Sequence, residues 1–305
     1  MTPTKPCRNN MRKDVRLRVQ LALVCSALAF DAASAATHSA QPFGACADPI
    51  FIDGFDGPPN IAQRGDHVAG VGATAFVSDG FDFLTFDVSD PGVLNLIGGA
   101  QGTGFALGFV DGDFTQAYGI DRYGTMVNSF ATISTGNGAI DDIGTANPSS
   151  DPGGWTGFKQ DPSTGTLYAS ATSCGSSSHL YAIDRHTGSS TLVGELSDMP
   201  CAVGIAVASD GAMYGIDVQL DALFSIDKTN GTATLIGATG INTSSGDIDF
   251  DDSTGILYYA TRPGGAPSSQ LHTLDLATGA ATLVGAIPTE DITGLAIATP
   301  AVCSH

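Results

Sequence analysis

The chain has 305 residues, of which 31 are acidic, 12 are basic and 39 are glycine. Its formal charge of −19 excludes a general nucleic-acid binder or a protein that binds anionic membranes, because both need a basic surface. The length is sufficient for a large apolar core, so disulfides are not required for a stable fold.

Residues 1–35 have the pattern of a secretory signal peptide. Six basic residues precede a 12-residue apolar run, Val19–Phe30, and Ala33–Ala35 forms a small-residue cleavage site. The run is too short to span a bilayer comfortably, and no later segment is a candidate transmembrane anchor. Lipid attachment at Cys25 is the alternative, although the preceding Leu-Val matches that processing site poorly. We expect secretion to the periplasm or exterior, leaving a mature chain of charge −23.

Residues 36–69 form an N-terminal extension or linker, residues 70–300 carry an internal repeat, and residues 301–305 are a short tail. Five segments of the repeat end in glycine after one or two apolar residues. They are Leu96–Gly98, Asp142–Gly144, Leu192–Gly194, Leu235–Gly237 and Leu283–Gly285. Their glycines are 46, 50, 43 and 48 residues apart, a spacing that indicates a repeat architecture.

Each unit contains two hairpins. Alternating runs such as Leu180–Asp184 lead through a Gly-containing turn into the next apolar segment, and earlier hairpins such as Phe158–Ser170 have turns rich in Asp, Ser and Thr. We name the four short strands of a unit a, b, c and d. Four antiparallel strands at this period predict an all-β fold, the β-propeller. A β-sandwich does not account for the regular spacing.

The two ends of the repeat predict how the ring closes. Ile292–Ala298 matches strand a of the other units but has no b, c or d strand after it, whereas Thr74–Gly99 supplies b, c and d without their own a. We therefore predict five blades, with the C-terminal strand completing the first blade and removing exposed strand edges. A sixth blade built from residues 45–73 is the alternative.

Four cysteines remain after signal removal, and an even number in a secreted chain favours two disulfides. In a propeller the b–c loops and the d–a connections lie on one face. Cys174 is in a b–c loop and Cys201 is in the following d–a connection, so we predict that they form a disulfide. Cys46 and Cys303 flank the ring at opposite chain ends, and we predict that they form a second disulfide.

Acidic residues are frequent in the predicted turns, as at Asp161, Asp210 and Asp252. There an Asp side chain can accept hydrogen bonds from nearby backbone amides. Oxygen-rich runs such as Asp247–Asp252 are also compatible with calcium, but no EF-hand pattern is present, and we predict no cofactor.

Strand a contains the candidate binding residues. Equivalent positions of the five units hold Gly108, Gly157, Gly204, Asp247 and Gly294. Strand a is the innermost strand of a blade, so Asp247 is predicted to lie near the central channel. Asp249 and Lys159 occupy the position two residues later, on the same side of the strand. We expect these three residues to form a polar ligand-binding site; a mutually paired structural cluster is the alternative.

Two aromatic features accompany this cluster. Trp155, the sole tryptophan, begins strand a of the third unit; it could stack on a ligand or pack in the core. Tyrosine recurs at one position of strand b, which predicts packing between blades. These residues are Tyr118, Tyr168, Tyr214 and Tyr258.

The units Leu180–Gly194, Leu223–Gly237 and Leu271–Gly285 resemble the repeat of secreted bacterial propellers of the quinoprotein-like and related uncharacterised groups. The resemblance spans about residues 70–300 and implies the fold rather than a function. In quinoprotein alcohol dehydrogenases the corresponding unit carries a Trp after its Thr-Gly turn, where this chain has leucine. With five units instead of eight, this departure argues against a quinone-dependent oxidoreductase.

The sequence favours a monomeric, non-catalytic binding module for a glycan, a peptide or a surface protein. No nucleophile motif, metal-binding spacing or dinucleotide fingerprint appears. The alternative is a glycan-directed hydrolase that uses the channel carboxylates Asp247 and Asp249, which would need two acids about 5–10 Å apart in a concave site.

Overall fold

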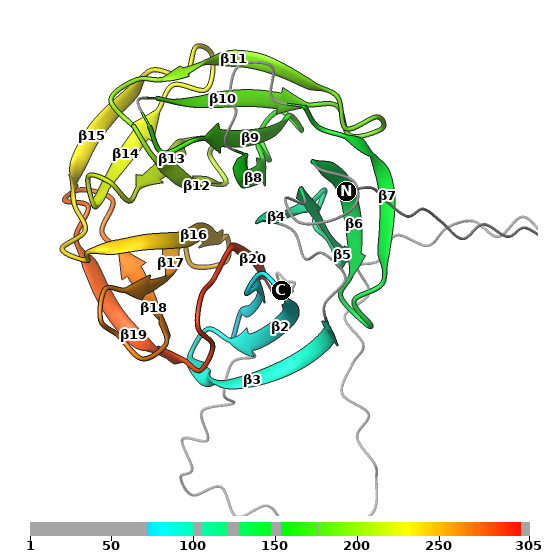
Figure 1. Ribbon diagram of the computed structural model, residues 1–305, viewed down its shortest axis with the longest axis vertical. Coiled ribbons are helices and arrows are strands. Elements are labelled where there is room, and N and C mark those ends of the chain that lie inside the picture. Colours follow the sequence, from blue (N-terminus) through cyan, green and yellow to red (C-terminus); the bar gives the residue numbers. More distant parts are fainter. Residues whose placement is uncertain (1–71, 100–104, 121–127, 148–153, 176, 300–305) are drawn as a thin grey trace, which may run out of the picture. The chain divides into compact units, whose positions relative to one another are not determined.

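The computed structural model describes residues 72–99, 105–120, 128–147, 154–175 and 177–299, all within the unit Asp48–His305. These residues form five four-stranded antiparallel sheets arranged as a ring (Figure 1). This confirms the predicted five-bladed β-propeller. The predicted signal peptide, Cys46 and Cys303 lie outside the described residues. None of the described residues forms a helix that could span a membrane.

Each blade runs outward from its innermost strand. Blade 1 contains β20 (Gly294–Ala298), β1 (Thr74–Ser78), β2 (Asp82–Asp87) and β3 (Asp90–Gly99). Blade 2 contains β4 (Phe105–Val110), β5 (Asp113–Ile120), β6 (Ser129–Ser134) and β7 (Ile140–Thr145). Blade 3 contains β8 (Trp155–Gln160), β9 (Leu167–Thr172), β10 (Ser178–Ile183) and β11 (Ser190–Leu196). Blade 4 contains β12 (Ala202–Val207), β13 (Met213–Asp217), β14 (Ala222–Ile226) and β15 (Ala233–Ala238). Blade 5 contains β16 (Thr243–Asp251), β17 (Ile256–Pro263), β18 (Ser269–Leu274) and β19 (Ala281–Ile287).

The C-terminal strand closes the ring as predicted. β20 pairs antiparallel with β1, with Phe76 opposite Ala296 and Val77 opposite Leu295. The first blade is therefore built from both ends of the repeat domain. The edge of β1 that faces the ring axis is therefore paired with β20 by backbone hydrogen bonds and is not left open.

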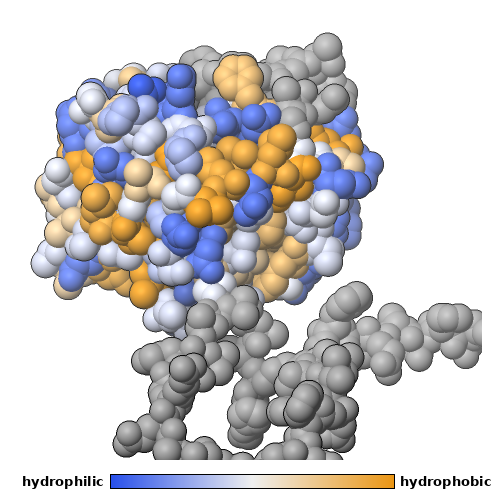
Figure 2. Space-filling view, turned by 90° about the horizontal axis from the view of Figure 1, so that it is seen from below, coloured by the Kyte–Doolittle hydropathy of each residue, from blue (hydrophilic) through white to orange (hydrophobic). Residues whose placement is uncertain are grey.

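The apolar core lies between the blades as five clusters, one at each interface. The strand-b tyrosines belong to these clusters; Tyr118 lies between blades 2 and 3, and Tyr168 between blades 3 and 4. This confirms their predicted packing role. Figure 2 shows that apolar side chains also remain on the rim of the ring. The leucines of the repeated outer-strand segments are among them: Leu96, Leu192, Leu235 and Leu283.

The repeated glycine of each outer strand contacts the turn between strands c and d of the next blade. A Cβ on Gly194 would overlap the carbonyl oxygen of Asn230 and lie 2.6 Å from its carbonyl carbon. Equivalent glycines contact equivalent turns around the ring, and Gly285 of blade 5 meets Pro91 of blade 1. The two halves of the sequence repeat are therefore complementary surfaces, because the glycine of one blade accommodates the Gly-containing turn of the next.

Candidate functional site

Three charged side chains meet at the centre of the ring. Lys159 projects from β8, and Asp247 and Asp249 project from β16. The Lys159 Nζ atom lies 3.5 Å from Oδ2 of Asp247 and 3.9 Å from Oδ1 of Asp249. The side chains of Asp247, Lys159 and Asp249 are 0%, 5% and 13% exposed. The structure thus brings together the three residues that the sequence placed near the channel; we call them the axial cluster.

The axial cluster binds the backbone of the closing strand. Oδ2 of Asp247 accepts a hydrogen bond from the Leu295 amide at 2.9 Å, and Oδ2 of Asp249 accepts one from the Ile297 amide at 2.8 Å. Lys159 donates to the Leu295 carbonyl at 2.7 Å and also to the Leu107 carbonyl of β4. These bonds satisfy inner-edge groups of β20 that would otherwise be costly to bury.

Burial dominates the electrostatics of the axial cluster. It raises the pKa of Asp247 to about 7, although Lys159 and the amides of Leu295 and Ile248 act in the opposite direction. Burial also raises the pKa of Asp249 to about 6, again opposed by Lys159 and by a backbone amide. Desolvation destabilises the charged form of each carboxyl. This effect is larger than the stabilisation that the single ammonium of Lys159, shared by both carboxyls, provides.

The position of Asp247 follows from the glycine series of strand a. In the other blades this glycine approaches the inner strand of the next blade; a Cβ on Gly157, for example, would lie 2.8 Å from the Ile205 amide nitrogen. In blade 5 the carboxylate of Asp247 spans the gap to β20 instead. Gly204 of β12 leaves room for the Asp247 side chain on the side facing blade 4. A Cβ atom on residue 204 would lie only 2.6 Å from Oδ1 of Asp247.

A pocket of about 280 Å³ opens at the end of the ring axis where the inner strands begin. β-Bulges on three inner strands supply much of its wall: Thr156 in β8, Val203 in β12, and Ser244 with Ser245 in β16. Bulges redirect side chains and are frequent beside binding sites. Ile292 and Thr293 contribute from the segment before β20, and Cys174 and Ser173 from the loop after β9. We call this cavity the axial pocket.

The disulfide at the axial pocket confirms one of the two predicted pairs. Cys174 and Cys201 are bonded, with Cα atoms 4.2 Å apart and a sequence separation of 27. The bond joins the b–c loop of blade 3 to the d–a connection before β12, on the face that carries the axial pocket. Cys174 itself lines the pocket, so the disulfide fixes part of its rim.

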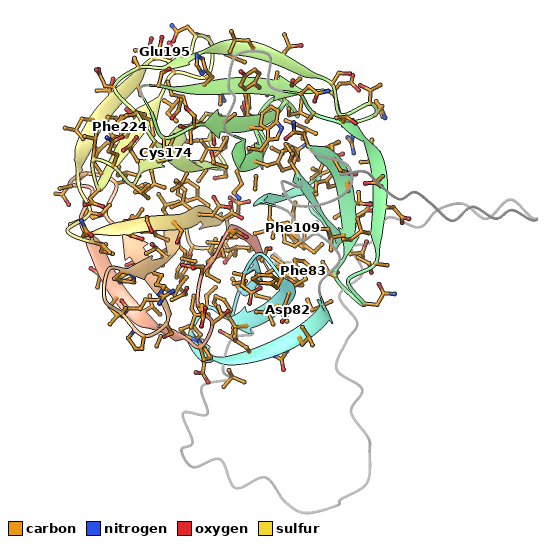
Figure 3. The ribbon with its side chains drawn as sticks, viewed as in Figure 1. Asp82, Phe83, Phe109, Cys174, Glu195 and Phe224 are labelled. Atoms are coloured by element: carbon orange, nitrogen blue, oxygen red, sulfur yellow. A yellow bond between two sulfur atoms is a disulfide. The ribbon has the colours of Figure 1, made fainter. Side chains whose placement is uncertain are left out.

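A smaller cavity, of about 110 Å³, lies at the opposite end of the axis. Lys159 and Asp249 line it together with Phe109, which lies near the centre of the ring in Figure 3. Asp252 also lines this cavity, and here the structure corrects an expectation. The turn-forming side chain of blade 5 is Asp251, whose Oδ1 accepts from the Ser253 amide at 3.0 Å, so Asp252 is left beside the cavity.

Trp155 is separate from the axial cluster. Its side chain is fully buried, its indole Nε1–H donates to the Ala146 carbonyl at 2.8 Å, and its ring packs edge-on against Tyr181 at 5.1 Å between centroids. Trp155 therefore packs between blades 2 and 3 and presents no surface to solvent. The described residues contain no group of three or more His, Cys, Asp or Glu side chains arranged to hold a metal ion.

Fold and site together define a five-bladed β-propeller with an axial charged cluster and a pocket at one end of its axis. The model of a family described as a domain of unknown function, DUF4394, matches residues 204–296. This match runs from β12 to β20 and includes Asp247 and Asp249 but not Lys159. No curated protein matches the chain.

Three solved structures are similar to this chain at low identity. TolB from Acinetobacter baumannii is 15% identical with a TM-score of 0.44, over 72% of this chain and 51% of that one. A structural genomics protein of unknown function from Bacteroides thetaiotaomicron is 15% identical with a TM-score of 0.43, over 60% and 52%. The calcium-binding protein regucalcin from Agrobacterium tumefaciens is 17% identical with a TM-score of 0.45, over 74% and 76%. The chain spans about half the length of the first two proteins.

Sequence inspection missed the axial pocket. Its wall comes from bulged residues, and a bulge becomes visible only when the partner strand shows which residue is left unpaired. The serine pair Ser244–Ser245, directly before the unusual Asp247, is the one sequence signal that could have indicated it.

Proposed function

We propose that this chain is an exported, non-catalytic binding module that holds part of its ligand in the axial pocket. The observation that carries the proposal is the set of bulged inner strands that directs Thr156, Val203, Ser244 and Ser245 into one cavity. Its volume of about 280 Å³ is close to the lower end of the range for small-molecule sites, about 300–1,000 Å³. The cavity therefore suits a single chemical group of a larger ligand.

The chemistry of the wall favours a neutral polar group. Among the described residues that line the pocket, hydroxyl-bearing and apolar side chains are present and charged ones are absent. Hydroxyls exchange hydrogen bonds with other hydroxyls as donor or acceptor. A terminal sugar of a glycan has this chemistry, and the negative charge of the protein disfavours anionic ligands.

The state of the axial cluster supports binding rather than hydrolysis. A glycan hydrolase needs carboxyl groups that reach the substrate, whereas Asp247 is fully buried and uses both oxygens for backbone amides. Export is supported by the Cys174–Cys201 disulfide, because such bonds persist in oxidising compartments.

The test is a glycan array with the wild-type protein, followed by calorimetric titration of each positive glycan. Ser244→Trp places an indole at the exposed mouth of the pocket and is expected to lower affinity by at least about tenfold, because it excludes the bound sugar. Ser189→Trp, on an exposed turn of blade 3, is the matched control and is expected to bind normally. Glycan binding that Ser244→Trp leaves unchanged would contradict the location of the site, and a ligand found only among peptides would contradict its chemical class.

A further inference from the structure

The inner strand of blade 1 differs from the other four because the chain end supplies it. β20 pairs with β1 from the other end of the repeat, and most hydrogen bonds of the axial cluster to inner-strand backbone go to β20. The Leu295 amide donates a hydrogen bond to Asp247, its carbonyl accepts one from Lys159, and the Ile297 amide donates one to Asp249. The three charged side chains thus join blades 3 and 5 to the closing strand.

The charges of the axial cluster do not balance. One ammonium faces two carboxyl groups, so the cluster carries a net charge of −1 when both are ionised. A buried excess charge is expensive, and uptake of one proton removes it. A protonated carboxyl still offers its carbonyl oxygen to a backbone amide, so proton uptake preserves the contact with β20.

The surroundings do not supply a compensating charge. The other strands packed around the cluster, β4, β12 and β20, carry no ionisable side chain. The other ionisable groups nearby include Tyr258 and Tyr259 on β17, Tyr168 on β9, Asp251 at the end of β16, and Asp252 beyond it. Burial raises the pKa of Tyr259, so its phenol stays neutral, and the carboxyl groups of Asp251 and Asp252 can only add negative charge.

We propose that the axial cluster is a proton-controlled latch on the closing strand: it holds β20 most tightly when it has taken up a proton and releases it more readily once that proton is lost. This proposal goes beyond ligand binding and does not depend on the axial pocket being occupied. Opening of β20 exposes Asp247 and Asp249 to water, where their protons are held less tightly than in the closed ring.

The direction of the pH effect follows from the raised pKa values of Asp247 and Asp249 in the closed ring, about 7 and about 6. An exposed Asp has a pKa of about 3.9. Between the pKa of an exposed Asp and the raised pKa values of the closed ring, the closed state therefore binds more protons than the open state. The stabilisation that these protons give to the closed state is lost as the pH rises through the two raised pKa values. For a single carboxyl the opening constant rises about tenfold per pH unit between pH 5 and pH 6.

The experiment is hydrogen–deuterium exchange of the segment Ile292–Ala298 at pH 5, 6, 7 and 8, corrected for the pH dependence of chemical exchange. We expect protection to be more than tenfold lower at pH 7 than at pH 5. Asp249→Asn leaves one carboxylate facing one ammonium and is expected to flatten this dependence. Asp141→Asn removes an equal charge from the exposed outer strand of blade 2 and is expected to keep the wild-type profile.

A second variant separates charge from packing. Lys159→Met removes the only ammonium of the cluster while keeping most of the apolar stem. We expect weak protection of β20 at pH 8 and recovery at pH 5, where both carboxyls are neutral. The proposal is overturned by wild-type protection that does not change with pH, by an Asp249→Asn profile as steep as wild type, or by a Lys159→Met variant equally unprotected at both pH values.

Discussion

The contact between Gly194 and the turn of blade 4 allows a quantitative test of how neighbouring blades dock. In Gly194→Ala the new Cβ would overlap the carbonyl oxygen of Asn230 and lie 2.6 Å from its carbonyl carbon. Real Cβ atoms essentially never come within 3.0 Å of another heavy atom. Both partners are backbone, so no side chain can rotate away, and blades 3 and 4 must separate locally.

Overpacking of this kind costs about 1–3 kcal/mol, occasionally more, and we expect Gly194→Ala to lie near 3 kcal/mol because backbone must move. For a domain of this size, each kcal/mol lowers Tm by about 2–4 °C. The expected loss is therefore about 6–12 °C, measured by thermal unfolding under circular dichroism at constant pH.

Gly92→Ala is the matched control. Gly92 also lies on an outermost strand, but the nearest atom to its Cβ position is Oδ1 of Asp90 at 3.6 Å, an ordinary contact. We expect its stability to change by no more than about 0.5 kcal/mol. A Gly194→Ala protein that melts within about 2 °C of wild type would refute the argument that outer-strand glycine is required by the docked turn.

Two further predictions concern single features of the fold. The Cys174–Cys201 bond closes a 27-residue separation, so replacing both cysteines by serine should reduce the free energy of unfolding by about 3.5 kcal/mol on the chain-entropy model; an unchanged urea midpoint would exclude that contribution. Trp155 is the only tryptophan and is fully buried. The fluorescence of the native protein should therefore be blue-shifted and resist quenching by acrylamide, and both properties should disappear on unfolding. Strong quenching of the native protein would contradict the burial of Trp155.

The sequence by itself determined the ring. Its repeated glycines and Asp-containing turns indicated four short strands per unit, and the unmatched strand at the C-terminus predicted closure with Thr74–Gly99. These features could be found because they are local: a turn needs particular residues within a few positions, and a period can be measured along one chain. The Cys174–Cys201 pair followed from the same topology.

The tertiary structure alone decided what the central residues do. The sequence placed Lys159, Asp247 and Asp249 near the axis, but their common target, the backbone of β20, lies more than forty residues away from each of them. Backbone groups have no sequence signature, so this convergence could not be predicted from residue types. Hydrogen bonds across a closed ring depend on how five blades meet, and that geometry exists only after folding.

The same reason explains the other differences. The turn of blade 5 uses Asp251 instead of Asp252 because strand register decides which carboxylate faces the following amides. Trp155 is buried because blade 2 covers it, and the axial pocket exists because bulges displace Thr156 and Val203 from their ladders. Local chemistry fixed which residues form strands and turns, whereas partner strands and neighbouring blades fixed which side chains reach the axis.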